Sequence, residues 1–199
     1  MSKARGFSLK DQLFNRDKIR YLAALFSTAD SGFDGADFEA RVMARLPDLE
    51  LKERIVWIAE VLEHLLPQDF NTAAAVIESA LPPPLDPTKT DDDFGDFIFA
   101  PLAEFVARNG QQDLDLSLSL LEELTKRFSV EFAIRHFLNA HPAQTMAQMT
   151  RWASHKNYHL RRLASEGTRR HCPGGGRSGW RWMRGYPFLT CCTVTEPVM

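Results

Sequence analysis

The chain has 199 residues, of which 44% are hydrophobic and 25% are charged, a composition ordinary for a globular protein with one sizeable core. No apolar run approaches the ~20 residues that a membrane span needs. The basic start of the chain is not followed by the apolar core of a signal peptide. These features argue against a membrane protein, and we expect a cytoplasmic location.

The expected elements are helices from one end of the chain to the other. Apolar residues recur at helical spacing in the segments 17–29, 38–46, 55–66, 72–81, 94–108, 114–128, 129–140, 143–154 and 158–165. Pro47, Pro67 and Pro142 mark helix ends, Ser129 is the expected cap of the segment that it opens, and strand signals are scarce. Helices of ~10–16 residues joined by short turns predict an all-α fold, a HEAT-like α-solenoid of stacked antiparallel helix pairs.

Residues 1–169 therefore form one predicted helical repeat domain with a candidate internal hinge at 81–93. Pro82–Pro84 cannot be helical throughout, and the three acids Asp91–Asp93 repel one another. Asp93 is the expected cap of the following helix. The acids lack the interleaved spacing of a calcium loop, so we expect no metal there.

The charges are segregated along the chain, although the net charge is only −2. Residues 126–169 carry eight Lys and Arg side chains and only two acids, Glu131 and Glu166. A basic half commonly marks a surface for nucleic acid or another anion. Solvated helix faces are the alternative explanation.

Residues 170–199 form an irregular tail that does not resemble the rest. They hold all three Cys, two of the four Trp and five of the 11 Gly, and helical periodicity disappears. The positions of Cys172, Cys191 and Cys192 do not have zinc-site spacing. Two explanations follow from this composition: a disordered, linker-like tail, or a shifted reading frame.

The genetic code favours the shifted frame. A frame that starts at the third base of the His171 codon begins with Leu, then Pro or Ser, then Trp, Arg or Gly. With CGN arginine codons, the same frame across Trp180–Arg184 reads Ala, then Leu, Met or Val, then Asp and Ala. That is ordinary helix composition, and we predict a frameshift near Arg170. Early stop codons in the alternative frame of the gene would exclude it.

Three motifs carry a resemblance to a known family. They are Leu9-Lys-Asp-Gln-Leu-Phe-Asn15, Ser129-Val-Glu-Phe-Ala-Ile-Arg135 and Tyr158-His-Leu-Arg-Arg-Leu-Ala-Ser-Glu-Gly-Thr-Arg169. With the hidden Leu-Pro-Trp after Arg169, the chain resembles the bacterial DNA alkylation repair proteins of the AlkC/AlkD superfamily, and the AlkC branch more closely. The resemblance covers residues 7–169.

The resemblance implies a HEAT-like solenoid whose concave, basic face holds duplex DNA. It also implies a monofunctional DNA glycosylase of base excision repair, which hydrolyses the N-glycosidic bond of cationic alkylated purines such as 3-methyladenine. By the same resemblance we expect a monomer without a cofactor, bound to the nucleoid in the bacterial cytoplasm. A non-catalytic helical-repeat module that binds DNA or protein is the rival prediction.

By the resemblance, Glu131 and Glu166 are the catalytic acids and Arg162 is the active-site arginine. Arg162 and Glu166 are four residues apart on one helix, so the arginine could hold the carboxylate ionised and aimed. The alternatives are an exposed surface ion pair for these two residues and a helix-dipole interaction for Glu131.

Further cations around these residues are candidate DNA contacts. Arg135, Lys156, His159, Arg161 and Arg169 are expected to contact phosphates, and Tyr158 to stack on a sugar or base. The alternative for Arg135 is a partly buried stem between helices. Trp152 lies at helical spacing and is expected in the core, and the histidines lack the partners of a metal site.

The chain departs from the family where the Pro-Leu-Pro-Trp segment is expected. That segment falls at Arg170–Gly174, so Gly174 replaces the aromatic residue that would line the lesion site. We therefore predict that the chain as written is much less active than its frame-corrected version.

Overall fold

The computed structural model describes residues 8–88 and 95–168, and their regular structure is helical. The helices are α1 (Leu9–Leu13), α2 (Arg16–Ala29), α3 (Gly35–Arg45), α4 (Leu51–Leu65), α5 (Phe70–Ala80), α6 (Ala100–Asn109), α7 (Leu114–Thr125), α8 (Glu131–Ala140), α9 (Pro142–Ala153) and α10 (Tyr158–Glu166). Two short 3-10 turns, Leu46–Asp48 and Phe97–Phe99, precede α4 and α6. The described residues show β-pairing only as an isolated bridge between Gly95 and Phe128. The all-α prediction is confirmed.

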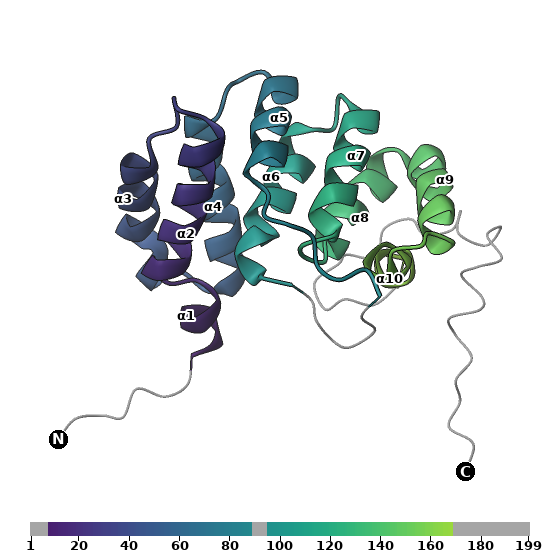
Figure 1. Cartoon of the computed structure of the whole chain (residues 1–199), viewed down its shortest axis with the longest axis horizontal. Coiled ribbons are helices and arrows are strands. Elements are labelled where there is room, and N and C mark those ends of the chain that lie inside the picture. Colours follow the sequence, from purple (N-terminus) through teal and green to yellow (C-terminus); the bar gives the residue numbers. More distant parts are fainter. Residues whose placement is uncertain (1–7, 89–94, 169–199) are drawn as a thin grey trace, which may run out of the picture.

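The helices stack in two layers, as a solenoid of antiparallel pairs requires. The helices α2, α5 and α7 pack side by side in one layer, and α3, α4, α6, α8 and α9 follow one another in the second (Figure 1). Helix α10 lies across the end of this row, where it packs on α7 and α9. The predicted solenoid architecture is therefore confirmed.

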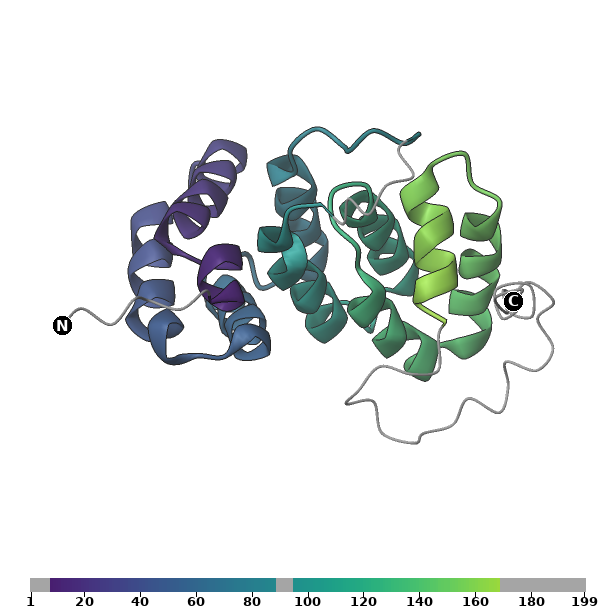
Figure 2. The same ribbon diagram turned by 90° about the horizontal axis from the view of Figure 1, so that it is seen from below.

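The row of helices bows, so that α1 and α10 lie on the same side of the molecule. Both are at the lower side in Figure 1 and face the viewer when the molecule is seen from below in Figure 2. Helices α4, α6 and α8 begin at this lower side and run upward. The first turns of these three helices therefore lie on the side that carries α10.

Side-chain caps mark the starts of half of the α-helices in the described residues. Side chains of Asn15, Asp34, Asp69, Asp113 and Asn157 each accept a hydrogen bond from the backbone at the start of the helix that follows.

One expected cap differs from the structure, and another lies outside the described residues. Asp96, not Asp93, accepts from the backbone of Ile98 at the turn before α6, and Asp93 lies outside the described residues. Helix α8 begins at Glu131 after Val130, one residue later than a Ser129 cap would allow. Phe128, just before this segment, is paired with Gly95 in the isolated bridge.

Large side chains fill the space between the two layers. Phe26, Phe38, Phe137 and Trp152 are among the fully buried residues, so the prediction that Trp152 is in the core is confirmed. The indole nitrogen of Trp152 donates to Oε2 of Glu122 at 2.7 Å. This bond satisfies the polar atom of the ring, as burial requires.

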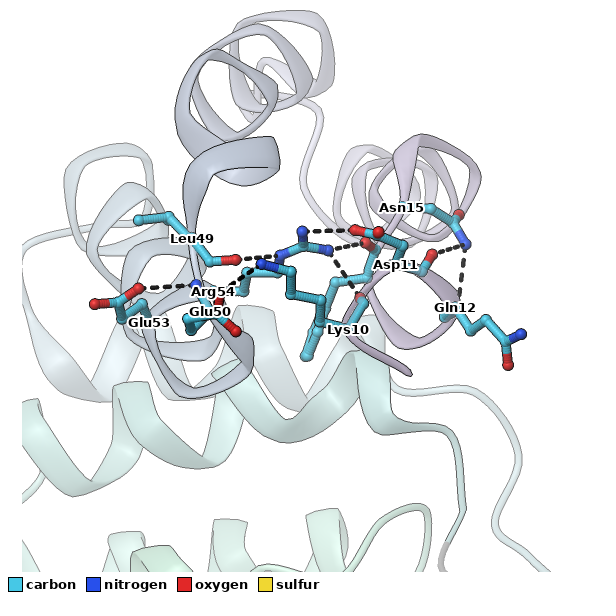
Figure 3. Close-up of polar contacts among 9 residues, drawn as sticks. Lys10, Asp11, Gln12, Asn15, Leu49, Glu50, Glu53 and Arg54 are labelled. Carbon is cyan, nitrogen blue, oxygen red and sulfur yellow. Dashed lines mark hydrogen bonds and ion pairs between the residues drawn. The ribbon is translucent and has the colours of Figure 1, made fainter. Parts of the chain in front are cut away.

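A buried arginine joins the N-terminal motif to α4. The side chain of Arg54 is 1% exposed, and its guanidinium donates to the carbonyl oxygens of Lys10, Phe14 and Leu49 and to the carboxylate of Asp11 (Figure 3). The bonds to Ser8 and Arg54 hold the pKa of Asp11 below its ordinary value. The first motif of the resemblance therefore has a structural role in attaching α1.

The described part of the candidate hinge is held against other elements. The guanidinium of Arg127 donates to the Pro82 carbonyl at 2.8 Å, and Leu85 donates to the Lys126 carbonyl at 2.8 Å. The amide of Tyr158 donates to the Pro87 carbonyl at 3.0 Å. These bonds attach 82–87 to the residues that follow α7 and to the start of α10, and hinge motion at 81–93 stays a prediction.

Candidate nucleic-acid interface at the α8–α10 junction

Helix α10 starts and ends at well-defined residues. The side chain of Asn157 accepts from the backbone of His159 at 2.9 Å and caps the helix. At the other end Gly167 donates its backbone N–H to the Leu163 carbonyl at 2.8 Å. Leu160, Leu163 and Ala164 form the buried face of the helix, so the charged residues between them are directed away from the core.

A glycine lets the end of α10 lie against α8. A Cβ atom at Gly167 would lie 2.8 Å from Cγ2 of Ile134 and 3.0 Å from Cε of Met149. Carbon atoms do not approach so closely without displacement of the neighbour. The glycine after Glu166 is therefore required by packing on α8 and α9.

Arg135 joins the same two elements through polar contacts. Its guanidinium on α8 donates to the carbonyl oxygens of Glu166 at 3.3 Å and Gly167 at 3.4 Å. The positive charge faces the negative end of the α10 dipole, which stabilises both. This agrees with the expected alternative of a partly buried stem between helices, while two of five donors leave others available for a phosphate.

The two candidate catalytic acids come from these two helices. Glu131 is the first residue of α8, a half-buried position where the hydroxyl of Ser129 lies 3.5 Å from its Oε2. Glu166 is the last residue of α10, also half-buried. Because Arg135 is one turn beyond Glu131 and contacts the Glu166 carbonyl, the junction brings both acids into one region.

The expected ion pair between Arg162 and Glu166 differs from the structure. Both residues have interactions and both are half-buried. The ion pairs that described residues form with one another do not include this pair. Spacing of four residues places two side chains on one face, but it does not decide their rotamers.

Two further cations lie at the surface: Arg161 in α10, and Lys156 just before the helix. Arg161 is exposed, and its guanidinium donates to the carbonyl oxygens of His155 at 2.7 Å and Lys156 at 2.8 Å. Its Cζ lies 5.9 Å from the ring centroid of Tyr158. The side chain of Lys156 is exposed. Both cations can therefore reach a ligand from the surface.

His159 is placed differently from the expectation of a phosphate contact. Its side chain is buried, at 6% exposure, and its Nε2 lies 3.1 Å from the carbonyl oxygen of Asp86. This burial argues against a direct contact with DNA and gives the ring a role in holding 82–87 against α10. Arg169 lies outside the described residues.

Two residues at this surface were missed by the sequence reasoning. Phe132 on α8 is 51% exposed, and Lys52 on α4 has its Nζ 5.8 Å from the Phe132 ring centroid. The signal for Phe132 was present, because it falls outside the buried stripe of Ala133, Ile134, Phe137 and Leu138. The proximity of Lys52 to Phe132 could not be predicted from a local pattern, since α4 and α8 are far apart in the chain.

The described residues contain no helix with the length and apolar character to cross a membrane. Within the same part of the chain, no three His, Cys, Asp or Glu side chains gather as metal ligands would.

No model of a known protein family matches the chain. The uncharacterized protein YhaZ of Bacillus subtilis (strain 168) is 32% identical over 129 residues, which are 65% of this chain and 33% of that protein.

A solved structure is similar over nearly the whole chain. It is the Pseudomonas fluorescens alkylpurine DNA glycosylase AlkC bound to DNA containing an abasic site analog, with a TM-score of 0.75, 27% identity, and coverage of 94% of this chain and 49% of that one. The chain thus spans about a third of one relative and about half of the other. This similarity agrees with the motif resemblance: the chain has the helical fold of the AlkC-like alkylpurine DNA glycosylases.

Proposed function

We propose that this chain is a DNA repair glycosylase that hydrolyses the N-glycosidic bond of cationic alkylated purines, of the 3-methyladenine type, in duplex DNA. The observation that carries the proposal is the α8–α10 junction, where Arg135, one turn after Glu131, donates to the Glu166 carbonyl in an AlkC-like fold. The structural neighbour was solved bound to DNA, which supports DNA as the partner. A monomeric state and a cytoplasmic location stay predictions.

Hydrolysis of this glycosidic bond requires a negatively charged carboxylate rather than a strong acid that protonates the leaving base. A 3-alkylated adenine carries a positive charge and leaves as a neutral base, so its glycosidic bond is already weakened. Bond breaking leaves positive charge on the sugar. A fixed carboxylate stabilises this oxocarbenium character and orients the attacking water, as in glycoside hydrolysis.

The side chains at the junction have distinct proposed roles. Glu166 and Glu131 are proposed to face the developing charge, and Arg162 stays a predicted active-site residue. Lys156 and Arg161 contact phosphates, which supplies affinity and register but not sequence readout. Tyr158 is proposed to stack on a sugar or base.

The decisive variant is Glu166→Gln in the full chain. Base release from alkylated duplex DNA should fall by about 10²–10³-fold, since a preorganised charge is lost. Binding of an abasic-site duplex should remain, because the amide keeps the shape of the carboxylate. Glu131→Gln should act in the same direction, and Glu78→Gln, an exposed glutamate on α5, is the matched control. A non-catalytic module would release no base with or without Glu166.

The tail offers a second test. The frame-corrected chain should excise alkylated bases much faster than the chain as written, because the proposed frameshift removes the aromatic wall of the lesion site. Residues 169–199 lie outside the described part of the structure. Equal rates for the two chains would refute the frameshift explanation without affecting the Glu166 test.

A further inference from the structure

Phe132 is an aromatic side chain exposed beside the proposed catalytic acids. It is 51% exposed and follows Glu131 directly in the first turn of α8. The next two residues, Ala133 and Ile134, belong to the buried face of α8. Phe132 is also apolar, but it lies outside this buried face. A single exposed apolar residue is ordinary on a protein surface, but two cations flank this ring.

Two cations from different helices flank the ring of Phe132. Nζ of Lys52 lies 5.8 Å and Cζ of Arg135 lies 5.5 Å from the ring centroid. Both distances are within the ~6 Å range of cation–π contact. Among the ion pairs that the described residues form with each other, neither Lys52 nor Arg135 takes part. Because no acid of the described residues forms an ion pair with Lys52 or Arg135, both positive charges are available to an anionic ligand.

This group of three residues is continuous with the proposed site. Arg135 belongs to both, because it also donates to the Glu166 and Gly167 carbonyls. Lys52 extends the surface to the first turn of α4, outside the basic segment 126–169. Helices α4 and α8 both begin at the lower side of the molecule, where α10 lies (Figure 1, Figure 2).

We propose that Lys52, Phe132 and Arg135 form a nucleotide-stacking surface that holds one strand of the DNA next to Glu131. The ring of Phe132 packs on a nucleobase or deoxyribose, and the two cations contact the flanking phosphates. This proposal rests on the proposed function, since it concerns the same DNA. Phe132 acts as a positioning residue and takes no part in the chemistry.

The charges favour a nucleic acid over a protein as the occupant. An apolar protein surface placed on Phe132 would desolvate Lys52 and Arg135 without compensation, which is costly. A nucleotide offers a π face and a phosphate together, so it matches the ring and both cations.

The test measures binding of the full chain to a duplex that carries a tetrahydrofuran abasic analogue, by fluorescence anisotropy. Phe132→Ala should weaken binding about tenfold, as expected for loss of one stacked base. Phe132→Trp should retain the affinity, and Phe132→Leu should not, because a leucine is apolar without a π face. Lys52→Ala should lower the slope of log K against log salt by about 0.9.

The matched control is Tyr21→Ala, an aromatic residue 40% exposed on α2, which should leave binding unchanged. Because Phe132 is exposed, its variants should unfold at the wild-type temperature. The proposal is wrong if Phe132→Ala or Phe132→Leu binds like wild type. It is also wrong if sedimentation shows a wild-type dimer that Phe132→Ala dissociates.

The binding readout separates this inference from the proposed function. If wild type binds the abasic duplex through Phe132 but releases no base, the glycosylase proposal fails alone. If wild type releases alkylated bases and Phe132→Ala keeps both affinity and rate, the stacking surface fails alone.

Discussion

The N-terminal helices and the α8–α10 junction use their charges in different ways. In α2 and α3, three arginines are paired with acids of α3: Arg16 and Arg20 with Glu39, and Arg41 with Asp37. The hydrogen bonds from Arg20 and then Arg16 hold the pKa of Glu39 below its ordinary value. These charges are neutralised within the protein and serve the fold.

At the junction the cations contact backbone carbonyls or solvent. Arg135 and Arg161 donate to carbonyl oxygens, and Lys156 is exposed. Ion pairs among the described residues include none from these three. A carbonyl orients a cation without cancelling its charge, so this region keeps a positive field for an anionic ligand. Charges that are paired within the protein therefore stabilise the fold, whereas charges without an acidic partner in the described part of the chain mark the proposed DNA surface.

The largest expected loss of stability follows from removal of the buried Arg54 side chain in the N-terminal helices. Arg54→Ala should lower the free energy of unfolding by about 3 kcal/mol, because it leaves the carbonyl oxygens of Lys10, Phe14 and Leu49 without their donor. Urea unfolding measures the change. Arg41→Ala, which removes an exposed pair, should leave the midpoint nearly unchanged. Equal losses for the two variants would contradict the assigned role of Arg54.

A smaller loss of stability is expected at the junction. Gly167→Ala should lower the free energy of unfolding by about 1–2 kcal/mol, because its Cβ would overlap Ile134, an overpacking cost that the helix propensity of alanine partly offsets. Thermal unfolding and abasic-duplex binding should both report the change. Gly32→Ala in an exposed turn is the control. A variant that is as stable as wild type would show that α10 adjusts freely against α8.

The comparison of charges predicts a difference in salt dependence. Lys156→Ala should lower the slope of log K against log salt for duplex binding by about 0.9, the value for one phosphate contact. Arg41→Ala should leave that slope unchanged, since Arg41 is paired with Asp37. Titrations between low and moderate salt measure both. Equal slopes for Lys156→Ala and wild type would remove Lys156 from the DNA surface.

The smallest expected effect is a pH dependence at the N-terminal motif. The folded-state pKa of Asp11 is lowered, first by the hydrogen bond to Ser8 and then by Arg54. A lowered pKa adds stability above the unfolded pKa, about 3.9 for aspartate, and this stability is lost as pH falls through the folded pKa. Urea unfolding at pH 7, 5 and 3 should show Asp11→Asn less stable than wild type at the first two values and converging at the third. A constant difference would contradict the sign.

Much of the helix pattern could be predicted because its causes are local. Apolar spacing and residues such as Asn157 and Pro142 act within a few positions of the chain, and the helices lie close to where they were expected. Glu131, Arg162 and Glu166 were found through motifs, and their catalytic roles stay predictions. The rotamers of Arg162 and Glu166 could not be predicted, since the neighbours that select them come from elsewhere in the chain.

Local sequence features predict the helical fold of the described residues, the starts of many helices and the gathering of cations in residues 126–169, because hydrophobic period, capping and composition are properties of adjacent residues. The burial of Arg54, the need for a glycine at position 167, the contact of His159 with the 82–87 segment and the contact of Lys52 with Phe132 arise from tertiary packing. Each of these depends on contacts between distant helices, and close packing rather than any local pattern selects those contacts.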